Sequence, residues 1–267
     1  MTSVARTFAD GTVIARRNLI KIKRVPEILV FVLLSPIMFV LLFAYVFGGA
    51  IDPGDGTNYR VFLIGGIFAQ TIVFGSSFTG AGLAEDMQKG IIDRFRSLPM
   101  SRSAVLFGRT VSDITYNLIS LAVMSLTGLV VGWRISSSIH EAAAAYLLLV
   151  LFGFALSWVM AYVGLLVPSV EVINNASFMV IMPLTFVSNA FVPIESFPTA
   201  LGYFAAWNPV SAVTQASREL FGNIPDGVPA PDYWSLQHPA LYTLIWVVVI
   251  LLIFVPLSVR RFQQTSR

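Results

Sequence analysis

The chain has 267 residues, of which 56% are hydrophobic and only 12% are charged, and its net charge is +3. Soluble domains carry about 25% charged residues, so this composition excludes a soluble globular protein and predicts an integral membrane protein. Cysteine is absent, which excludes disulfides, thiolate catalysis and cysteine metal sites. Both histidines fall in predicted loops, so we expect no metal site. The basic residues follow a membrane pattern, so we expect no nucleic-acid partner.

Residues 1–26 predict an amphipathic helix at the membrane surface. At about 100° per residue, one narrow helical face collects apolar side chains, and six basic residues lie outside it. The apolar side chains are Val4, Phe8, Ala15, Leu19 and Ile22. Basic groups beside an apolar stripe are typical of a helix lying among anionic headgroups. We therefore expect an interface helix in contact with membrane lipids.

Six apolar segments follow, each about long enough to cross a hydrocarbon core of about 30 Å as a helix. They cover residues 28–47, 61–84, 114–133, 143–167, 172–191 and 241–259. Pro36 and Pro183 predict kinks, and the small residues of the second segment predict close packing against other helices. The predicted fold is an all-α polytopic membrane protein, with residues 1–267 forming one transmembrane domain.

A highly charged segment, residues 85–102, separates the second and third spans. Each charge would cost about 2.5 kcal/mol or more in hydrocarbon, so this segment faces water. Its apolar side chains recur at near-helical spacing, which predicts a short amphipathic helix ended by Pro99. These side chains are Met87, Ile91, Ile92, Phe95 and Leu98. Such a helix could receive a push from a soluble partner, and a solvated connecting loop is the alternative.

Residues 192–239 are too polar and too rich in proline to span the membrane, yet they hold many aromatic side chains. Asn208 and Pro209 predict the start of a helix, and Gly222 predicts its end. We expect two short re-entrant helices in the outer leaflet, with Trp207, Tyr233 and Trp234 at headgroup level.

The charge distribution predicts the orientation. Six spans place both termini on one side of the membrane. Fourteen of the seventeen Lys and Arg residues then fall on that side, together with residues 85–102. The positive-inside rule makes that side cytoplasmic, so both termini are cytoplasmic and residues 192–239 are external.

Two stretches carry a resemblance to a known family. The first runs Gly80-Ala81-Gly82-Leu83-Ala84-Glu85-Asp86, then from Gly90 to Arg102, and continues as Gly108-Arg109-Thr110. The second runs from Phe191-Val192-Pro193 through Phe197-Pro198 to Asn208-Pro209-Val210. Together they resemble the permease subunits of ABC-2 type transporters, and more closely the daunorubicin-resistance type of drug-efflux permease of actinobacteria. The resemblance covers essentially the whole chain.

The resemblance implies a transport subunit of the bacterial plasma membrane, not an enzyme, that pairs with a second permease, which we expect to be an identical copy. Two separate ATPase subunits would bind ATP and Mg, so no cofactor is expected here. The sequence contains no Gly-x-x-x-x-Gly-Lys-Ser/Thr phosphate loop. The implied coupling residues are Glu85, Asp86, Gly90, Asp93, Arg94, Arg96, Leu98, Pro99 and Arg102. Ser169 and Glu171 are expected to form a second contact with the ATPase.

The expected function is outward, ATP-driven export of a hydrophobic or amphiphilic, drug-like compound. The expected cavity-lining residues are Gln70, Ser76, Asn117 and Asn175. An ABC-2 exporter of a lipid, glycolipid or polysaccharide is the alternative, although the lack of a charged ring argues against a highly anionic polysaccharide.

Two more distant alternatives belong to other functional classes. An ATP-independent transporter or channel would need ionisable groups at membrane depth, and Asp113 and Glu171 come nearest to that depth. An intramembrane enzyme would need paired carboxylates, a Ser/His pair or a metal cluster, and the sequence shows none of these at membrane depth.

Overall fold

The structure, a computed structural model, describes residues 10–18, 20, 26–47, 58–92, 102–167, 169–225 and 231–264. All regular elements in these ranges are helical. The longer ones are α2 (Pro26–Leu42) with its π-helical continuation η1 (Phe43–Phe47), α3 (Tyr59–Gln88), α5 (Arg102–Val131), α6 (Ile139–Leu166), α7 (Val170–Phe186) and α11 (Pro239–Gln264). The shorter ones are η2 (Ile194–Ser196), α8 (Thr199–Trp207), α9 (Pro209–Leu220) and α10 (Trp234–Gln237).

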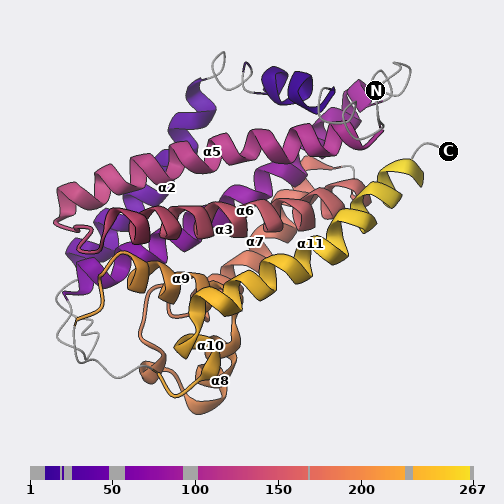
Figure 1. Cartoon of the computed structure of the whole chain (residues 1–267). Coiled ribbons are helices and arrows are strands. Elements are labelled where there is room, and N and C mark those ends of the chain that lie inside the picture. The colour runs from indigo at the N-terminus through magenta and orange to yellow at the C-terminus, as the bar shows by residue number, and fades with distance from the viewer. Residues whose placement is uncertain are drawn as a thin grey trace.

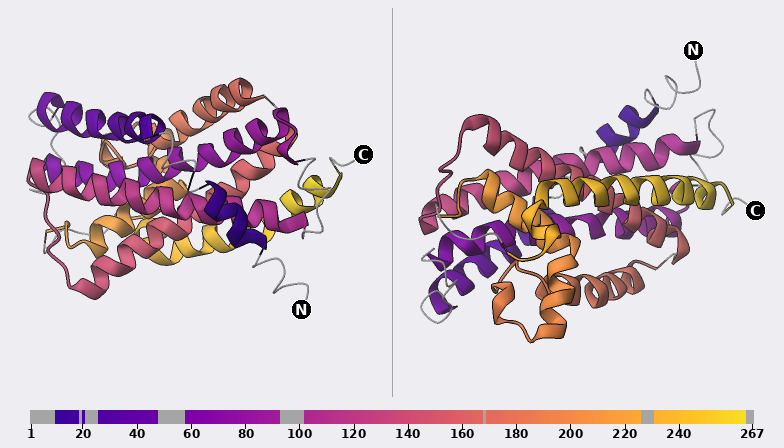
Figure 2. Two further views of the ribbon diagram at one scale, coloured as in Figure 1. Left: turned by 90° about the horizontal axis from the view of Figure 1, so that it is seen from above. Right: turned by 60° about the horizontal axis from the view of Figure 1, so that its bottom comes forward.

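The long helices form a bundle with α3 in its interior (Figure 1). Helix α3 contacts α5, α6 and α7, and α11 packs along α6. The short helices α8, α9 and α10 gather near the N-terminal end of α11 (Figures 1 and 2). The helical residues 10–18 lie toward the opposite end, where Ile14 shares a hydrophobic cluster with Phe262 of α11.

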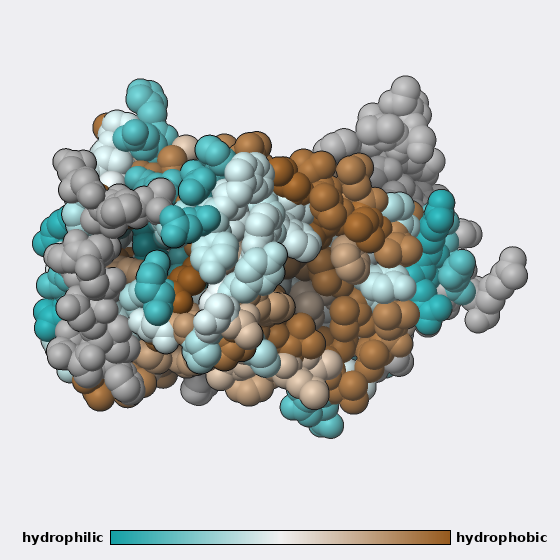
Figure 3. All heavy atoms as spheres, turned by 90° about the horizontal axis from the view of Figure 1, so that it is seen from below, coloured by the Kyte–Doolittle hydropathy of each residue, from teal (hydrophilic) through white to brown (hydrophobic). Residues whose placement is uncertain are grey.

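Four of the described helices are long and apolar enough to cross a membrane, and α2 with η1 and α7 supply two shorter apolar helices. Each of the six predicted segments overlaps one of these helices. On the face in Figure 3, hydrophobic residues cover a broad area and hydrophilic residues lie toward the ends. Together with the composition, these helices make the chain a multi-pass membrane protein.

Glycines allow α3 to touch its neighbours backbone to backbone. A Cβ built on Gly66 would lie 1.8 Å from the carbonyl oxygen of Ala190, and one on Gly80 would lie 2.7 Å from that of Met160. From the other side, a Cβ on Gly164 of α6 would lie 2.6 Å from the carbonyl oxygen of Gly80. The close packing predicted from the small residues of this span is therefore confirmed.

A buried arginine holds the short helix α9 against the bundle. Arg218 is 3% exposed, and its guanidinium donates to the carbonyl oxygens of Phe62 at 2.9 Å, Asn189 at 2.8 Å and Ala190 at 3.3 Å. It also lies 3.5 Å from the centre of the Phe62 ring. One side chain thus joins α9 to α3 and to the loop after α7.

The start of α9 is as predicted from the sequence. Asn208 caps it, because the Asn208 Oδ1 accepts from the Val210 amide at 2.8 Å, and Pro209 is its first residue. Gly222 follows its end with a φ of +68°. Residues 192–239 contain η2, α8, α9 and α10, so the expectation of two short helices there undercounted the helical elements.

Several helices have bounds that differ from those of the predicted spans. Helix α3 continues past residue 84 to Gln88, and α5 starts at Arg102, twelve residues before the predicted 114. The prediction excluded Asp113 from a span, yet its carboxylate is buried and accepts a hydrogen bond from the Thr79 hydroxyl.

Helix α7 is shorter than the predicted span, because it ends at Phe186 and the span was predicted to reach 191. Its last carbonyls are satisfied from outside the helix. The Asn208 Nδ2 donates to Leu184 O at 2.6 Å and to Val187 O at 2.7 Å. The Asn208 side chain thus supplies partners for carbonyls at the end of α7.

The predicted interface helix at residues 1–26 is described only in part. Residues 10–18 are helical, and residues 1–9, 19 and 21–25 lie outside the described residues. Of the predicted apolar face only Ala15 is described, and it is buried at 6% exposure. This segment packs on α5, where a Cβ built on Gly108 would lie 2.4 Å from the Gly11 carbonyl oxygen.

Candidate functional site

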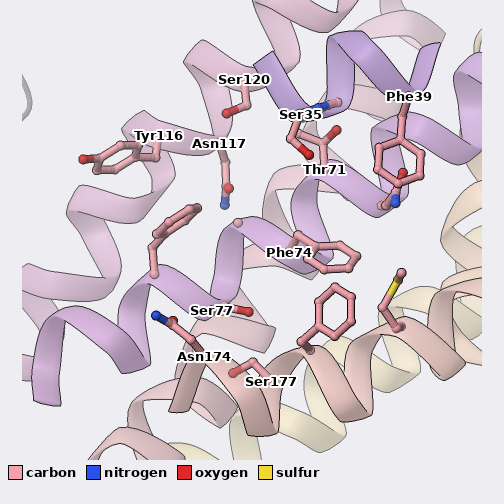
Figure 4. Close-up of a pocket in the computed structure, with 16 residues that line it drawn as sticks. Ser35, Phe39, Thr71, Phe74, Ser77, Tyr116, Asn117, Ser120, Asn174 and Ser177 are labelled. Atoms are coloured by element: carbon pink, nitrogen blue, oxygen red, sulfur yellow. The ribbon is translucent and has the colours of Figure 1, made fainter. Parts of the chain in front are cut away.

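A cavity of about 610 Å³ opens between α2, α3, α5 and α7 (Figure 4). The aromatic residues on its wall are Phe39, Phe74, Phe78, Tyr116 and Phe178. The other lining residues are Ser35, Pro36, Gln70, Thr71, Gly75, Ser77, Asn117, Ser120, Asn174, Ser177 and Met182. None of these residues carries a charge. The cavity therefore suits an apolar body with neutral polar groups, and its size is within the usual range of about 300–1,000 Å³ for small-molecule sites.

Two of the four residues predicted to line a cavity do so. Gln70 and Asn117 lie on the wall, whereas Ser76 and Asn175 do not. Ser76 is buried and its hydroxyl donates to Val73 O at 2.6 Å, and Asn175 is exposed on the surface of α7. Successive side chains on a helix point about 100° apart, so the adjacent Ser77 and Asn174 take these two places on the wall.

Two glycines make room for Asn117 on α5. Its side chain is 3% exposed and enters the bundle beside α3 and α6. A Cβ built on Gly75 would lie 3.0 Å from the Asn117 Oδ1, and one on Gly153 would lie 2.7 Å from its Nδ2. The position of this amide on the cavity wall therefore depends on the absence of side chains at positions 75 and 153.

The last turn of α3 carries the first residues of the predicted coupling segment. Glu85 and Lys89 form an ion pair at 2.6 Å, and the hydrogen bond from Lys89 to Glu85 raises the pKa of the Lys89 ammonium. Asp86 is 7% exposed and pairs with Arg17 at 2.6 Å. Gly90 has a φ of +64°, a left-handed conformation that glycine adopts readily where a helix ends.

The rest of the predicted coupling segment is largely outside the described residues. Asp93, Arg94, Arg96, Leu98 and Pro99 fall in the gap between residues 92 and 102. Arg102 is the first residue of α5. Glu85 and Asp86 belong to α3 itself, so any displacement at this end acts directly on the helix that lines the cavity.

The sequence did not predict the contacts that join the N-terminal segment to this end of the bundle. Arg17 pairs with Asp86, 69 positions away, and the Asn18 Nδ2 donates to the Ser112 Oγ at 3.2 Å, 94 positions away. No local pattern marks such pairs, because they depend on how the segment folds back over α3 and α5.

A smaller pocket of about 160 Å³ lies at the same end and shares Phe78 and Tyr116 with the large cavity. Arg109 and Asp113 of α5 line it. The Arg109 Nη2 donates to Phe78 O at 2.9 Å and takes the space where Gly82 has no side chain. These contacts join α5 to α3 next to the large cavity.

The residues predicted to form a second ATPase contact lie at the start of α7. Ser169 caps the helix, since its hydroxyl accepts from the Val172 amide at 3.5 Å. Glu171 is exposed in the first turn, where a negative charge is favourable. Both residues therefore stabilise the helix terminus, and the ATPase contact remains a prediction. Within the described ranges, no cluster of three or more His, Cys, Asp or Glu residues could hold a metal.

Comparisons with known proteins identify the family. Residues 11–221 match the family model described as ABC-2 type transporter. The chain is 36% identical over 205 residues to the daunorubicin resistance ABC transporter permease protein DrrB1 of Streptomyces coeruleorubidus, covering 76% of this chain and 72% of that protein.

Two further relatives are more distant. A probable doxorubicin resistance ABC transporter permease protein, DrrC, of Mycobacterium tuberculosis is 25% identical over 68% of this chain and 66% of its own length. A putative transport permease, ycf38, of Cyanophora paradoxa is 24% identical over 79% of this chain and 73% of its own length. From the family model and the first relative together, we conclude that the chain belongs to the ABC-2 type transporter family, as a transmembrane permease subunit and not an enzyme.

Proposed function

We propose that this chain is the permease of an exporter that moves a hydrophobic or amphiphilic, drug-like compound outward across the bacterial plasma membrane. The observation that carries the proposal is the cavity of about 610 Å³ with its five aromatic side chains and uncharged polar groups. Such a wall can hold a large apolar molecule and still contact its polar groups. The names of the relatives, which refer to daunorubicin and doxorubicin resistance, support a cargo of this kind.

As an ABC permease, the chain works with an ABC ATPase subunit, which binds the ATP. We propose that the partner pushes on residues 85–102 and that α3 transmits the push. Glu85 and Phe74 lie eleven residues apart on this one helix, a distance of about 16 Å along its axis. A continuous helix moves as a unit, so displacement at Glu85 also moves the cavity wall.

The proposed arrangement has six spans, with both termini and residues 85–102 in the cytoplasm and residues 192–239 outside. A second, identical permease and surrounding lipids complete the membrane part. Ser169 and Glu171 add a second contact with the ATPase. The charge asymmetry of the sequence supports this orientation.

The proposal is tested by reconstituting the chain with its co-purifying ATPase in vesicles and measuring ATP-dependent accumulation of daunorubicin. Phe74→Ala should reduce accumulation several-fold, because Phe74 lies on the cavity wall. The matched control is Phe204→Ala, since Phe204 is a phenylalanine of α8 that is 55% exposed and away from the cavity. Vesicles without ATP-dependent accumulation, or equal effects of both variants, would refute the proposal.

Coupling is tested separately. Glu85→Gln and Arg94→Gln should leave the ATPase bound and active but should lower export per ATP hydrolysed. Full export by both variants, with normal assembly, would contradict the proposed role of residues 85–102.

A further inference from the structure

Three residues that line the cavity each have a polar side-chain atom without a hydrogen-bond partner in the described part of the chain. These atoms are the Gln70 Oε1, the Ser77 Oγ and the Ser177 Oγ, and each atom is buried. Gln70 is 5% exposed and Ser177 is 7% exposed. Buried polar groups in native proteins are nearly always paired, so three unpaired groups around one cavity need a physical explanation.

Neighbouring hydroxyls show that pairing within the helix is available here. Thr71 donates to Ile67 O at 2.7 Å, and Ser76 donates to Val73 O at 2.6 Å. Both belong to the same helix as Ser77, yet Ser77 makes no such bond. Ser77 and Ser177 differ from these neighbours because their hydroxyls have no partner, although Thr71 lines the cavity too.

Helix geometry sets the spacing of these groups. Gln70 and Ser77 are seven residues apart on α3, so they lie on one face about 10 Å apart along the axis, with Phe74 between them. Ser177 comes from α7, which packs against α3, and next to it Phe178 lies edge-on to Phe74 with ring centres 6.5 Å apart. Along α3 the lining residues therefore alternate polar, aromatic and polar, and Figure 4 shows Phe74, Ser77 and Ser177 around the same cavity.

We propose that Gln70, Ser77 and Ser177 form a hydrogen-bonding site that selects a flat, apolar cargo with neutral hydroxyl-type groups about 10 Å apart. The ring body lies against Phe74 and Phe178, and its polar groups pair with the three free atoms. Because no lining residue is charged, the groups recognised are uncharged ones. This inference rests on the proposed transport function and adds the chemical class of the cargo.

The test uses a matched pair of fluorescent probes, 2,6-bis(hydroxymethyl)anthracene and 2,6-diethylanthracene, which share shape but differ in hydrogen bonding. Binding to the purified chain in detergent is measured by equilibrium dialysis, so neither the ATPase nor transport is required. The wild-type chain should bind 2,6-bis(hydroxymethyl)anthracene, the diol, more tightly than 2,6-diethylanthracene. Gln70→Leu should weaken diol binding about tenfold, and Ser77→Ala and Ser177→Ala several-fold, while binding of the diethyl compound stays within twofold.

Ser76→Ala is the matched control, because the Ser76 hydroxyl is already paired and lies off the wall. It should leave the binding of both probes unchanged. The three cavity variants should also unfold at a temperature equal to or above that of the wild type without ligand, since each removes an unpaired buried polar atom. A purely structural role would instead lower that temperature.

Two results would overturn the inference: equal loss of both probes in the cavity variants, or wild-type binding that does not favour the diol. Selective diol binding by a chain that shows no ATP-dependent export in vesicles would support the site and refute the proposed transport. The two proposals can therefore fail separately.

Discussion

The contact between α3 and α6 gives a sharp prediction about packing. A Cβ built on Gly164 would lie 2.6 Å from the carbonyl oxygen of Gly80, and its three nearest atoms all belong to the Gly80 backbone. Backbone atoms cannot rotate away as a side chain can. Ordinary contact begins at 3.4 Å, so Gly164→Ala must separate the two helices by about 0.8 Å.

Overpacking of this kind costs about 1–3 kcal/mol, and alanine returns up to about 1 kcal/mol of helix propensity. We expect Gly164→Ala to destabilise the chain by about 1–2 kcal/mol, measured as thermal unfolding of the purified protein in detergent. Gly202→Ala in α8 is the matched control, because its Cβ would meet nothing closer than 3.6 Å, and it should be neutral or slightly stabilising. If Gly164→Ala were as stable as Gly202→Ala, the backbone contact between α3 and α6 would be wrong.

Three further experiments test other contacts. Gly153→Ala would place a Cβ 2.7 Å from the Asn117 Nδ2, so the amide must leave its position. The affinity for daunorubicin, measured by equilibrium dialysis, should fall several-fold, and an unchanged affinity would contradict this. Arg218→Met removes the donor for the Phe62, Asn189 and Ala190 carbonyls and should lower the free energy of unfolding by about 2–4 kcal/mol. Arg218→Lys should recover only part of this loss. An Arg218→Met variant as stable as the wild type would disprove the anchoring role. A double-mutant cycle with Arg17→Met and Asp86→Asn should give a coupling free energy of only about 0.5 kcal/mol, because the Arg17 side chain is 36% exposed; a value several times larger would show that solvent does not screen the pair.

The six apolar helices were predictable because a charged side chain in the hydrocarbon core costs free energy. Charged residues therefore mark most ends of the apolar segments in the sequence. The sequence did not indicate that α5 continues through Asp113, whose carboxylate has a partner on another helix. Asp113 was treated as a boundary, but the Thr79 hydroxyl of α3 donates to its carboxylate inside the bundle. The cost of a buried charge depends on its partners, and a linear sequence does not state them.

The helix start at Asn208 was also predictable, because a cap and its first proline are adjacent in the chain. The same Asn208 side chain also donates to carbonyls at the end of α7, which the sequence did not indicate. The bond between Asn208 and the Val210 amide spans two positions in the sequence, whereas the bonds to Val187 O and Leu184 O span 21 and 24.

The composition and charge order were sufficient for the membrane class, the apolar segments and the family resemblance, since these follow from local hydrophobicity and from contiguous motifs. The cavity wall required the folded bundle. Ser77 lines the cavity and Ser76 does not, and Asn174 lines it while Asn175 does not. Residues of the same type at adjacent positions differ only by about 100° of rotation, and the neighbours that a helix meets determine which of them faces the cavity.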